Sequence, residues 1–451
     1  MVYKIMKRVT DMTEGKPVKL ILMFAIPLLI GDIFQQLYTV VDTMVVGHAL
    51  GDNAIAAIGG VNPLFNLIVY FSIGLNEGYQ IIMTQKFGAH DNKGLKQSIA
   101  GMLMLSVGFT AFITVASLVT LNPVLRFMNI PKTIFADAYA YIFVIFAGMI
   151  FTVGYNMFAS ILRAVGNSRI PLYFLILSSV LNVIWDVWFV MGLDMGLVGA
   201  AVATVAAQGV STVLCGIYIW KNYRDMLPKP EHFKVPKGIL TALITTGLSM
   251  AFMEGLVSMG TIIFQRANNM FGESIIASYT SARRMIDLLM RPMFTLANAN
   301  CIFAGQNWGA GKTDRINQGL KHVLIIETIW SACCFLLVYL LGAELIMFTT
   351  GTTDLMIIQN AVLSLKIHVV GYPVLGVLIC LRMVMQAKGK KIAPLVSSGI
   401  ELAMKIFSAA YMIPKLGYLG TCMTEPITWV LMMTYLIIMY WKQNKNDRGS
   451  Y

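Results

Sequence analysis

Two aspartates lie inside apolar segments that are long enough to cross a membrane. Asp42 lies in the segment LILMFAIPLLIGDIFQQLYTVVDTMVVGHAL, and Asp186 lies in the segment PLYFLILSSVLNVIWDVWFVMG. A carboxylate in hydrocarbon costs several kcal/mol and rarely persists there without a partner or a function. These two side chains are therefore the first candidates for chemistry, and the chemistry open to them is the binding of a proton or a cation.

Polar residues at helical spacing accompany both aspartates. Asn182 and Asp186 are four residues apart, so a helix places them on one face. Gln35, Tyr38 and Asp42 follow one another at spacings of three and four, so they share a face of an earlier helix. Carboxylate and amide oxygens are hard ligands that suit a proton or Na⁺. The pattern predicts an ion site built from two helices.

The two carboxylates are expected at the same depth in the membrane. Counted back from Gly47 and Gly192, both lie roughly 8–9 Å from the outer ends of their helices. Thr204, in the next span, falls at a comparable depth and adds a hydroxyl oxygen. Alternatively, each acid is satisfied by a local hydrogen bond and only fixes helix packing. The first six spans hold no Lys or Arg that is well placed to neutralise the acids, which favours a function.

The composition indicates an all-α membrane protein with many spans. Of its 451 residues, 57% are hydrophobic and 12% are charged, and the mean hydropathy is +0.71. A soluble chain of this length needs more polar surface. The first apolar run is too long for a signal peptide and has no small-residue cleavage site, so we expect it to be retained as a span. The twelve expected spans are approximately 20–47, 54–85, 97–121, 134–162, 170–191, 196–220, 238–268, 274–304, 318–342, 355–387, 392–413 and 418–441.

The placement of the charges that give the net charge of +12 indicates the topology of these spans. Lys and Arg concentrate in alternate connections, whereas the opposite connections hold only Arg126, Lys132, Arg266 and Lys415. The positive-inside rule then predicts that both termini are cytoplasmic. The expected location is a plasma membrane, the inner membrane of a bacterium. The basic excess points to anionic membrane lipids, not nucleic acid, as a partner.

The two halves of the chain repeat each other. ALGDNAIAA (49–57) matches MFGESIIAS (270–278), and TQKFGAHDNKG (84–94) matches GQNWGAGKTDR (305–315), both at an offset of 221 residues. Because six spans is an even number, the copies are parallel repeats, a plan typical of alternating-access transporters. Two pseudo-symmetric six-helix lobes follow. The expected divisions are a cytoplasmic segment 1–19, an N-lobe 20–222, a linker 223–237, a C-lobe 238–441 and a tail 442–451.

The acid site of the first half has no copy in the second half. The repeat places Ile263 opposite Asp42. Glu254, His368 and Glu401 fall near the middle of their spans instead, and they are candidates for a second coupling site. Glu401 lies four residues before Lys405, so an internal ion pair is the favoured interpretation there.

Other motifs exclude several classes of chemistry. The six cysteines lie in apolar stretches without the spacing of a zinc site or a disulfide framework. The segment 305–313 approaches a phosphate-binding loop, but Gln306 stands where the pattern needs a glycine. We expect no enzyme, no cofactor, and no metal beyond Na⁺ at Asp42, Asn182 and Asp186.

Nearly the whole chain resembles the multidrug and toxic compound extrusion (MATE) family. The resemblance rests on IPLLIGDIFQQLYTVVDTMVVGHALGDNAIAAIG, ILRAVGNSRIP, LNVIWDVWFVMGLDMGLVGAAVAT and GQNWGAGKTDRI, and it is greatest for the subgroup related to the DNA-damage-inducible F protein. The resemblance implies that four residues form a cation or proton site in the N-lobe, and that three line the nearby substrate chamber. The first set is Asp42, Asn182, Asp186 and Thr204; the second is Gln35, Tyr38 and Asn156.

Three functions remain open at this point. The first is a monomeric antiporter that exports amphipathic, cationic small molecules in exchange for H⁺ or Na⁺. The second is a flippase of the same superfamily for a lipid-linked or anionic sugar carrier. Such a flippase needs a cationic cleft, for which Arg283, Arg284 and Arg291 are the candidates. The third is a membrane-embedded enzyme, against which the scattered His and Cys residues argue.

Overall fold

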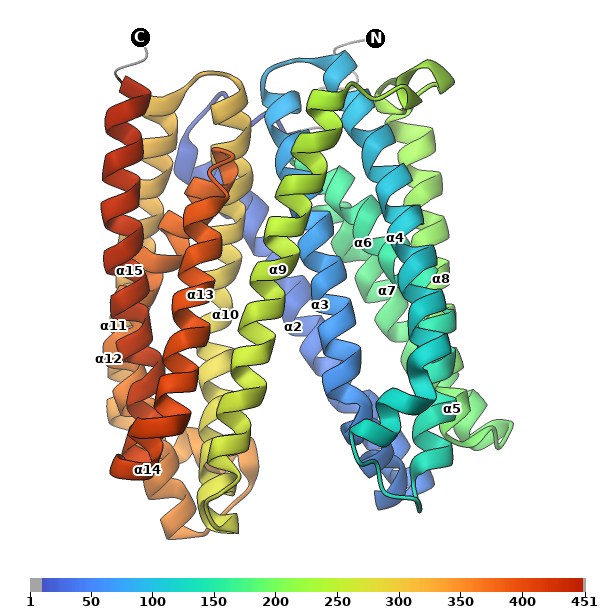
Figure 1. The fold of residues 1–451 in the computed structure, drawn as a ribbon, viewed down its shortest axis with the longest axis vertical. Coiled ribbons are helices and arrows are strands. Elements are labelled where there is room, and N and C mark those ends of the chain that lie inside the picture. The colour runs from blue at the N-terminus through green and yellow to red at the C-terminus, as the bar shows by residue number, and fades with distance from the viewer. Residues whose placement is uncertain (1–9, 449–451) are drawn as a thin grey trace. The chain divides into compact units, whose positions relative to one another are not determined.

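The computed structural model describes residues 10–448, and every regular element among these residues is a helix (Figure 1). The ends of the expected segments 1–19 and 442–451 therefore lie partly outside the described residues. The main helices are α2 (Pro17–Leu50), α3 (Asp52–Gly88), α4 (Asn92–Phe127), α5 (Phe135–Ala147), α6 (Met149–Ala164), α7 (Arg169–Asp186), α8 (Gly196–Asn222), α9 (Lys237–Asn268), α10 (Glu273–Gly309), α11 (Thr313–Thr350), α12 (Leu355–Ala387), α13 (Ile392–Phe407), α14 (Ile413–Leu416) and α15 (Tyr418–Arg448). Short 3₁₀ turns, η2 (Arg224–Met226) and η3 (Pro230–Phe233), follow α8, and π-helical segments, η1 (Val187–Gly192) and η4 (Ser408–Met412), extend α7 and α13.

The predicted twelve-span, all-α fold is confirmed. Within the described chain, ten helical spans are long and apolar enough to cross a membrane, and α5 with α6 forms an eleventh that is bent by 44°. The twelfth is α10, which is 37 residues long. Its composition alone does not mark it as a span, because Arg283, Arg284, Asp287 and Arg291 interrupt its apolar surface.

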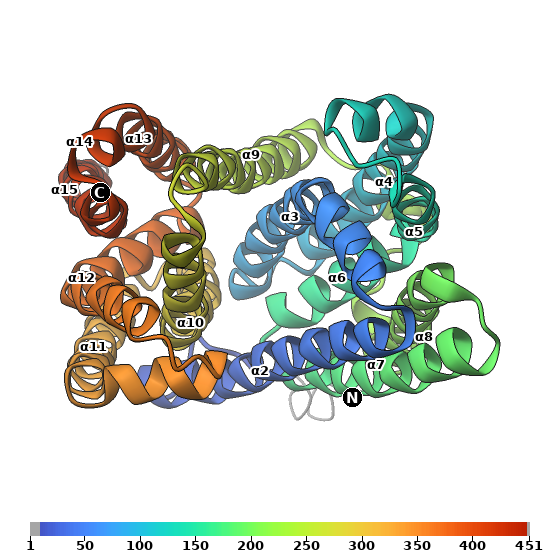
Figure 2. The same ribbon diagram turned by 90° about the horizontal axis from the view of Figure 1, so that it is seen from below.

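Two compact units make up the chain. Among the described residues, one comprises residues 10–11 together with Ile26–Ala251, and the other comprises Met12–Ala25 together with residues 252–448. Viewed end-on, α3 to α8 form one bundle and α10 to α15 form another (Figure 2). The unit limits fall inside α2 and α9, whereas the expected lobe limits fall in the linker, so those lobe limits stay a prediction. A core in the first unit is built by side chains of α3, α4, α5, α6 and α8.

Backbone geometry repeats between the two halves at the offset expected from the sequence. The turn after α3 places His90 at φ 53°, and the turn after α10 places Gly311 at φ 71°, 221 residues later. Gly196 and Gly417 form a second such pair, with φ values of 57° and 61°. The π-helical segments η1 and η4 begin at the same offset. The internal duplication is therefore a property of the backbone as well as of the sequence.

Small residues let α3 and the first part of α9 approach closely within the first unit. A Cβ atom on Gly78 would lie 2.5 Å from the Cα atom of Gly247, and one on Gly74 would lie 2.8 Å from the Cα atom of Ala251. Gly74 and Gly78 are four residues apart on one face of α3, which is the small-xxx-small spacing of packed membrane helices. Backbone contact of this kind leaves no room for a side chain.

We expect Gly78→Ala to destabilise the protein, because the added methyl group meets the backbone of α9 and not a flexible side chain. Overpacking of this type costs about 1–3 kcal/mol. The matched control is Gly59→Ala on the same helix, where nothing lies within 4 Å of the added Cβ and where alanine favours the helix. Thermal unfolding of both purified variants in detergent checks the prediction, and equal midpoints would contradict it.

Candidate functional site

The two intramembrane aspartates meet in the first unit. Asp42 lies on α2 and Asp186 is the last residue of α7, and their carboxyl groups are close enough to interact directly. The two helices approach each other at Gly31 of α2, which faces Leu172 and Leu175 of α7. Asp186 is fully buried, and Asp42 is partly buried. The structure thus brings together the pair that the sequence singled out.

Several oxygens of this pair have hydrogen-bonding capacity that the described residues do not use. Both carboxylate oxygens of Asp186, Oδ1 of Asp42 and Oδ1 of Asn182 are buried and accept no hydrogen bond from a described residue. The ion pairs formed among the described residues include neither aspartate. Buried polar atoms are nearly always satisfied, so these oxygens suit a proton or a small cation.

Asn182 and Thr204 form the polar flank of the site. Asn182 Nδ2 donates a hydrogen bond of 3.3 Å to Thr204 Oγ1, which in turn donates one of 3.0 Å to the carbonyl of Ala200. This contact joins α7 to α8 and leaves the amide oxygen of Asn182 as an acceptor. Carboxylate, amide and hydroxyl oxygens are ligands that suit Na⁺ as well as a proton.

The backbone changes pitch immediately after Asp186. Here α7 continues as the π-helical segment η1, and the amide of Met195 donates 3.0 Å to the carbonyl of Phe189. Close packing holds η1 against α8, since a Cβ on Gly199 would lie 3.1 Å from Phe189. Single π-helical turns are frequent at functional sites because they re-aim side chains. Sequence reasoning missed this feature, because no residue type marks it.

Two tyrosines lie within electrostatic reach of the acids. The hydroxyl group of Tyr38, an expected chamber residue on α2, interacts electrostatically with both Asp42 and Asp186. The hydroxyl group of Tyr141 on α5 does the same. Tyr141 was missed, since a tyrosine in an apolar helix carries no distinguishing signal. The contacts of the other two expected chamber residues are local. The carbonyl of Gln35 accepts from Thr39, and Asn156 Nδ2 donates to the carbonyl of Thr152.

A charged network occupies the second unit. Arg283 Nη1 on α10 lies 2.5 Å from Glu425 Oε1 on α15, and Arg283 Nε lies 3.0 Å from Asp287 Oδ1. His368 Nε2 on α12 lies 3.5 Å from Glu425 Oε2, and the His368 ring packs edge-on against Trp429. Sequence reasoning named His368 but missed Glu425. The signal was present as a lone acid in the last apolar span.

The remaining candidates of the second unit gather around Lys405. Lys405 Nζ lies 2.9 Å from Glu401 Oε1, which confirms the expected ion pair, and it donates 3.2 Å to Thr261 Oγ1. Glu254 lies within electrostatic reach of Glu401 and Arg382. In contrast to Asp42 and Asp186, Glu401 and Glu425 each lie in an ion pair with a cationic side chain of the second unit.

Known proteins share this fold and sequence pattern. A family model described as MatE matches residues 27–188 and 249–412. The probable multidrug resistance protein YpnP of Bacillus subtilis is 25% identical over 388 residues, 86% of each chain. YoeA, a protein of the same description from the same organism, is 25% identical over 441 residues, 94% of each chain.

Solved structures of transporters have the same fold. A MATE protein crystallised in a bent conformation has a TM-score of 0.90 at 23% identity and covers 97% of this chain and 98% of its own. A MOP superfamily transporter from Pyrococcus furiosus, described by the reverse polarity of its binding pocket, has a TM-score of 0.86 at 22% identity, over 96% of this chain and 97% of its own.

Proposed function

Because this chain belongs to the multidrug and toxic compound extrusion (MATE) family, we propose that it is a secondary active antiporter. It exports amphipathic, mainly cationic compounds in exchange for inward H⁺ or Na⁺. The names of its relatives, which are multidrug resistance and multidrug export proteins, support the export of drug-like compounds. The expected setting is a bacterial inner membrane, with both termini in the cytoplasm and the protein acting as a monomer.

The observation that carries the proposal is the contact between the carboxyl groups of Asp42 and Asp186 without a neighbouring cation among the described residues. Two carboxylates that interact directly repel each other when both are charged, so one positive charge between them relieves the repulsion. Asn182 and Thr204 supply further oxygens beside Asp186. The pair is therefore the ion-binding element of the proposed antiporter.

Coupling requires this element to have different ion affinities in the inward-open and outward-open states. In the proposed rocking cycle, ion binding at Asp42 and Asp186 favours one state, and substrate binding favours the other. Tyr38 and Tyr141 lie within electrostatic reach of both acids, so in this cycle their hydroxyl groups respond to whether the pair holds an ion.

The test separates the two coupling ions. Purified protein in liposomes loaded with a cationic dye such as ethidium receives either an inward proton gradient or an inward Na⁺ gradient, at zero membrane potential. We expect dye efflux with at least one gradient and its loss when an ionophore collapses that gradient. Dye movement that ignores both gradients would refute ion-coupled antiport.

The flippase alternative has less support. It needs a cleft of unpaired positive charge for an anionic carrier. Of the three candidate arginines on α10, Arg283 forms ion pairs with both Glu425 and Asp287, so protein carboxylates already balance its charge.

A further inference from the structure

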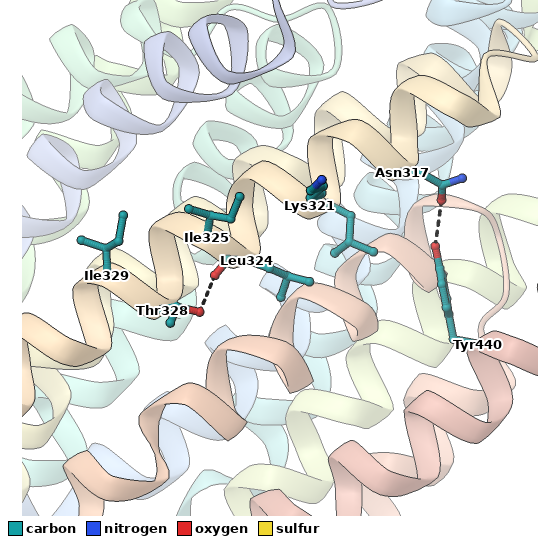
Figure 3. A pocket seen from close by; sticks show the side chains of 8 residues that line it. Asn317, Lys321, Leu324, Ile325, Thr328, Ile329 and Tyr440 are labelled. Atoms are coloured by element: carbon teal, nitrogen blue, oxygen red, sulfur yellow. Dashed lines mark hydrogen bonds between the residues drawn. The ribbon is translucent and has the colours of Figure 1, made fainter.

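A surface groove runs between α11 and α15 in the second unit, outside the proposed ion site (Figure 3). Its volume is about 520 Å³, and most of its wall is one face of α11. Asn317, Lys321, Leu324 and Ile325 follow that face at spacings of one helical turn or less, and Tyr440 of α15 closes one end. Polar residues therefore occupy one end of the groove. The other end is apolar apart from Thr328, whose hydroxyl donates a hydrogen bond to the carbonyl of Leu324.

The polar end lies at the level of the membrane–water interface. Tyr440 donates a hydrogen bond of 3.2 Å to Asn317 Oδ1, and Lys388 Nζ lies 5.1 Å from the centre of the Tyr440 ring. The next residues on α15 are the exposed Trp441 and Lys442. Tyrosine and tryptophan followed by lysine mark the headgroup level of a membrane helix. Asn317, which is bonded to Tyr440, must lie at the same level.

The apolar end extends into the hydrocarbon. Lys321 is one turn deeper than Asn317, and Ile329 lies about 12 Å beyond Lys321 along the helix axis. Ile325 and Ile329 are 48% and 59% exposed, so they face the lipid surroundings and not the protein core. The length and character of this wall match an extended acyl chain.

The positive charge of Lys321 determines which class of lipid headgroup the groove attracts. Its side chain is exposed, and none of the ion pairs between described residues includes it. Lys388 is buried, with its ammonium group between the rings of Trp308 and Tyr440, so Lys321 is the exposed cation that lines this end of the groove. A basic site between membrane helices, next to an apolar groove, attracts an anionic headgroup in preference to a zwitterionic one.

We propose that this groove binds an anionic phospholipid of the leaflet at which α11 begins and α15 ends, the leaflet that the charge distribution predicts to be cytoplasmic. The phosphate lies beside Lys321 and Asn317, and one acyl chain lies along the α11 face from Leu324 to Ile329. The proposal is independent of the ion site, since no residue of the groove belongs to it.

Native mass spectrometry of the full-length protein, released from nanodiscs of equal phosphatidylglycerol and phosphatidylcholine content, tests the proposal. We expect the wild type to retain phosphatidylglycerol preferentially, and Lys321→Gln to reduce that preference roughly fivefold, the effect of one lysine near a membrane surface. The matched control is Lys237→Gln, at the exposed start of α9, because Lys237 does not line the groove. A second variant, Ile325→Trp, fills the groove without changing charge, and it should also lose retained lipid.

Three results would overturn the proposal. The first is equal retention of the two lipids by the wild type. The second is an equal loss of phosphatidylglycerol in Lys321→Gln and Lys237→Gln, which would show attraction by net charge alone. The third is unchanged retention in Ile325→Trp, which would show that no acyl chain occupies the groove.

Discussion

Asp186→Asn is expected to abolish ion-coupled export while leaving the protein inserted in the membrane. Asparagine has the same shape as aspartate but carries no negative charge. Asp186 is fully buried, and its oxygens accept no hydrogen bond from a described residue, so the charge is what the substitution removes. Losing one charge-assisted contact of about 1.5–3 kcal/mol weakens ion binding roughly 10- to 150-fold. Asp42→Asn should have the same effect, because each acid holds the ion jointly with the other.

The measurement is gradient-driven dye efflux from liposomes that contain equal amounts of each variant. Asp194→Asn is the matched control, because Asp194 is an exposed aspartate eight residues after Asp186, beyond η1. Thermal stability gives a second readout. Since the two carboxylates repel each other, Asp186→Asn should be at least as stable as the wild type, whereas a purely structural aspartate would lower stability on substitution. Normal export by both Asp42→Asn and Asp186→Asn would end the assignment of the site.

Local spacing allowed part of this site to be predicted from the sequence. The interval of four residues placed Asn182 and Asp186 on one helix face, and counting the helical rise placed Asp42 at the depth of Asp186. Both inferences use only the spacing and rise of residues within a regular helix, and helix geometry is nearly independent of context. The repeat was also visible, because turn residues such as Gly311 and Gly417 recur at a fixed offset.

What could not be predicted depends on packing between distant segments. The π-helical segment after Asp186 arises where η1 meets α8, and the sequence of α7 carries no mark of it. Tyr141 reaches the acids only because α5 packs in the same unit as α2 and α7. Glu425 and Arg283 are 142 residues apart, and neither the spacing nor the repeat joins them.

Arg283→Met is expected to be the most destabilising of the substitutions considered in the second unit. Glu425 is only 8% exposed, and Arg283 is its closest cation, at 2.5 Å. Removing the arginine leaves a buried carboxylate whose remaining ion-pair partner among the described residues is His368, at 3.5 Å. Breaking a buried pair from one side costs about 3–5 kcal/mol, because the remaining charge stays desolvated. Glu425→Gln should cost less, since Arg283 keeps its contact of 3.0 Å with Asp287.

The double variant makes this prediction specific to the pair. When Arg283→Met and Glu425→Gln are combined, neither charge is left without its partner. The loss of stability in the double variant should therefore be smaller than the sum of the two single losses by about 0.5–3 kcal/mol. Arg284→Met, the same change at the exposed neighbouring position, controls for the loss of an arginine from α10. Unfolding of the four proteins in detergent, followed by circular dichroism, gives the cycle. If Arg283→Met were as mild as Arg284→Met, or if the single losses of stability simply added, the charged network would not be holding α10, α12 and α15 together.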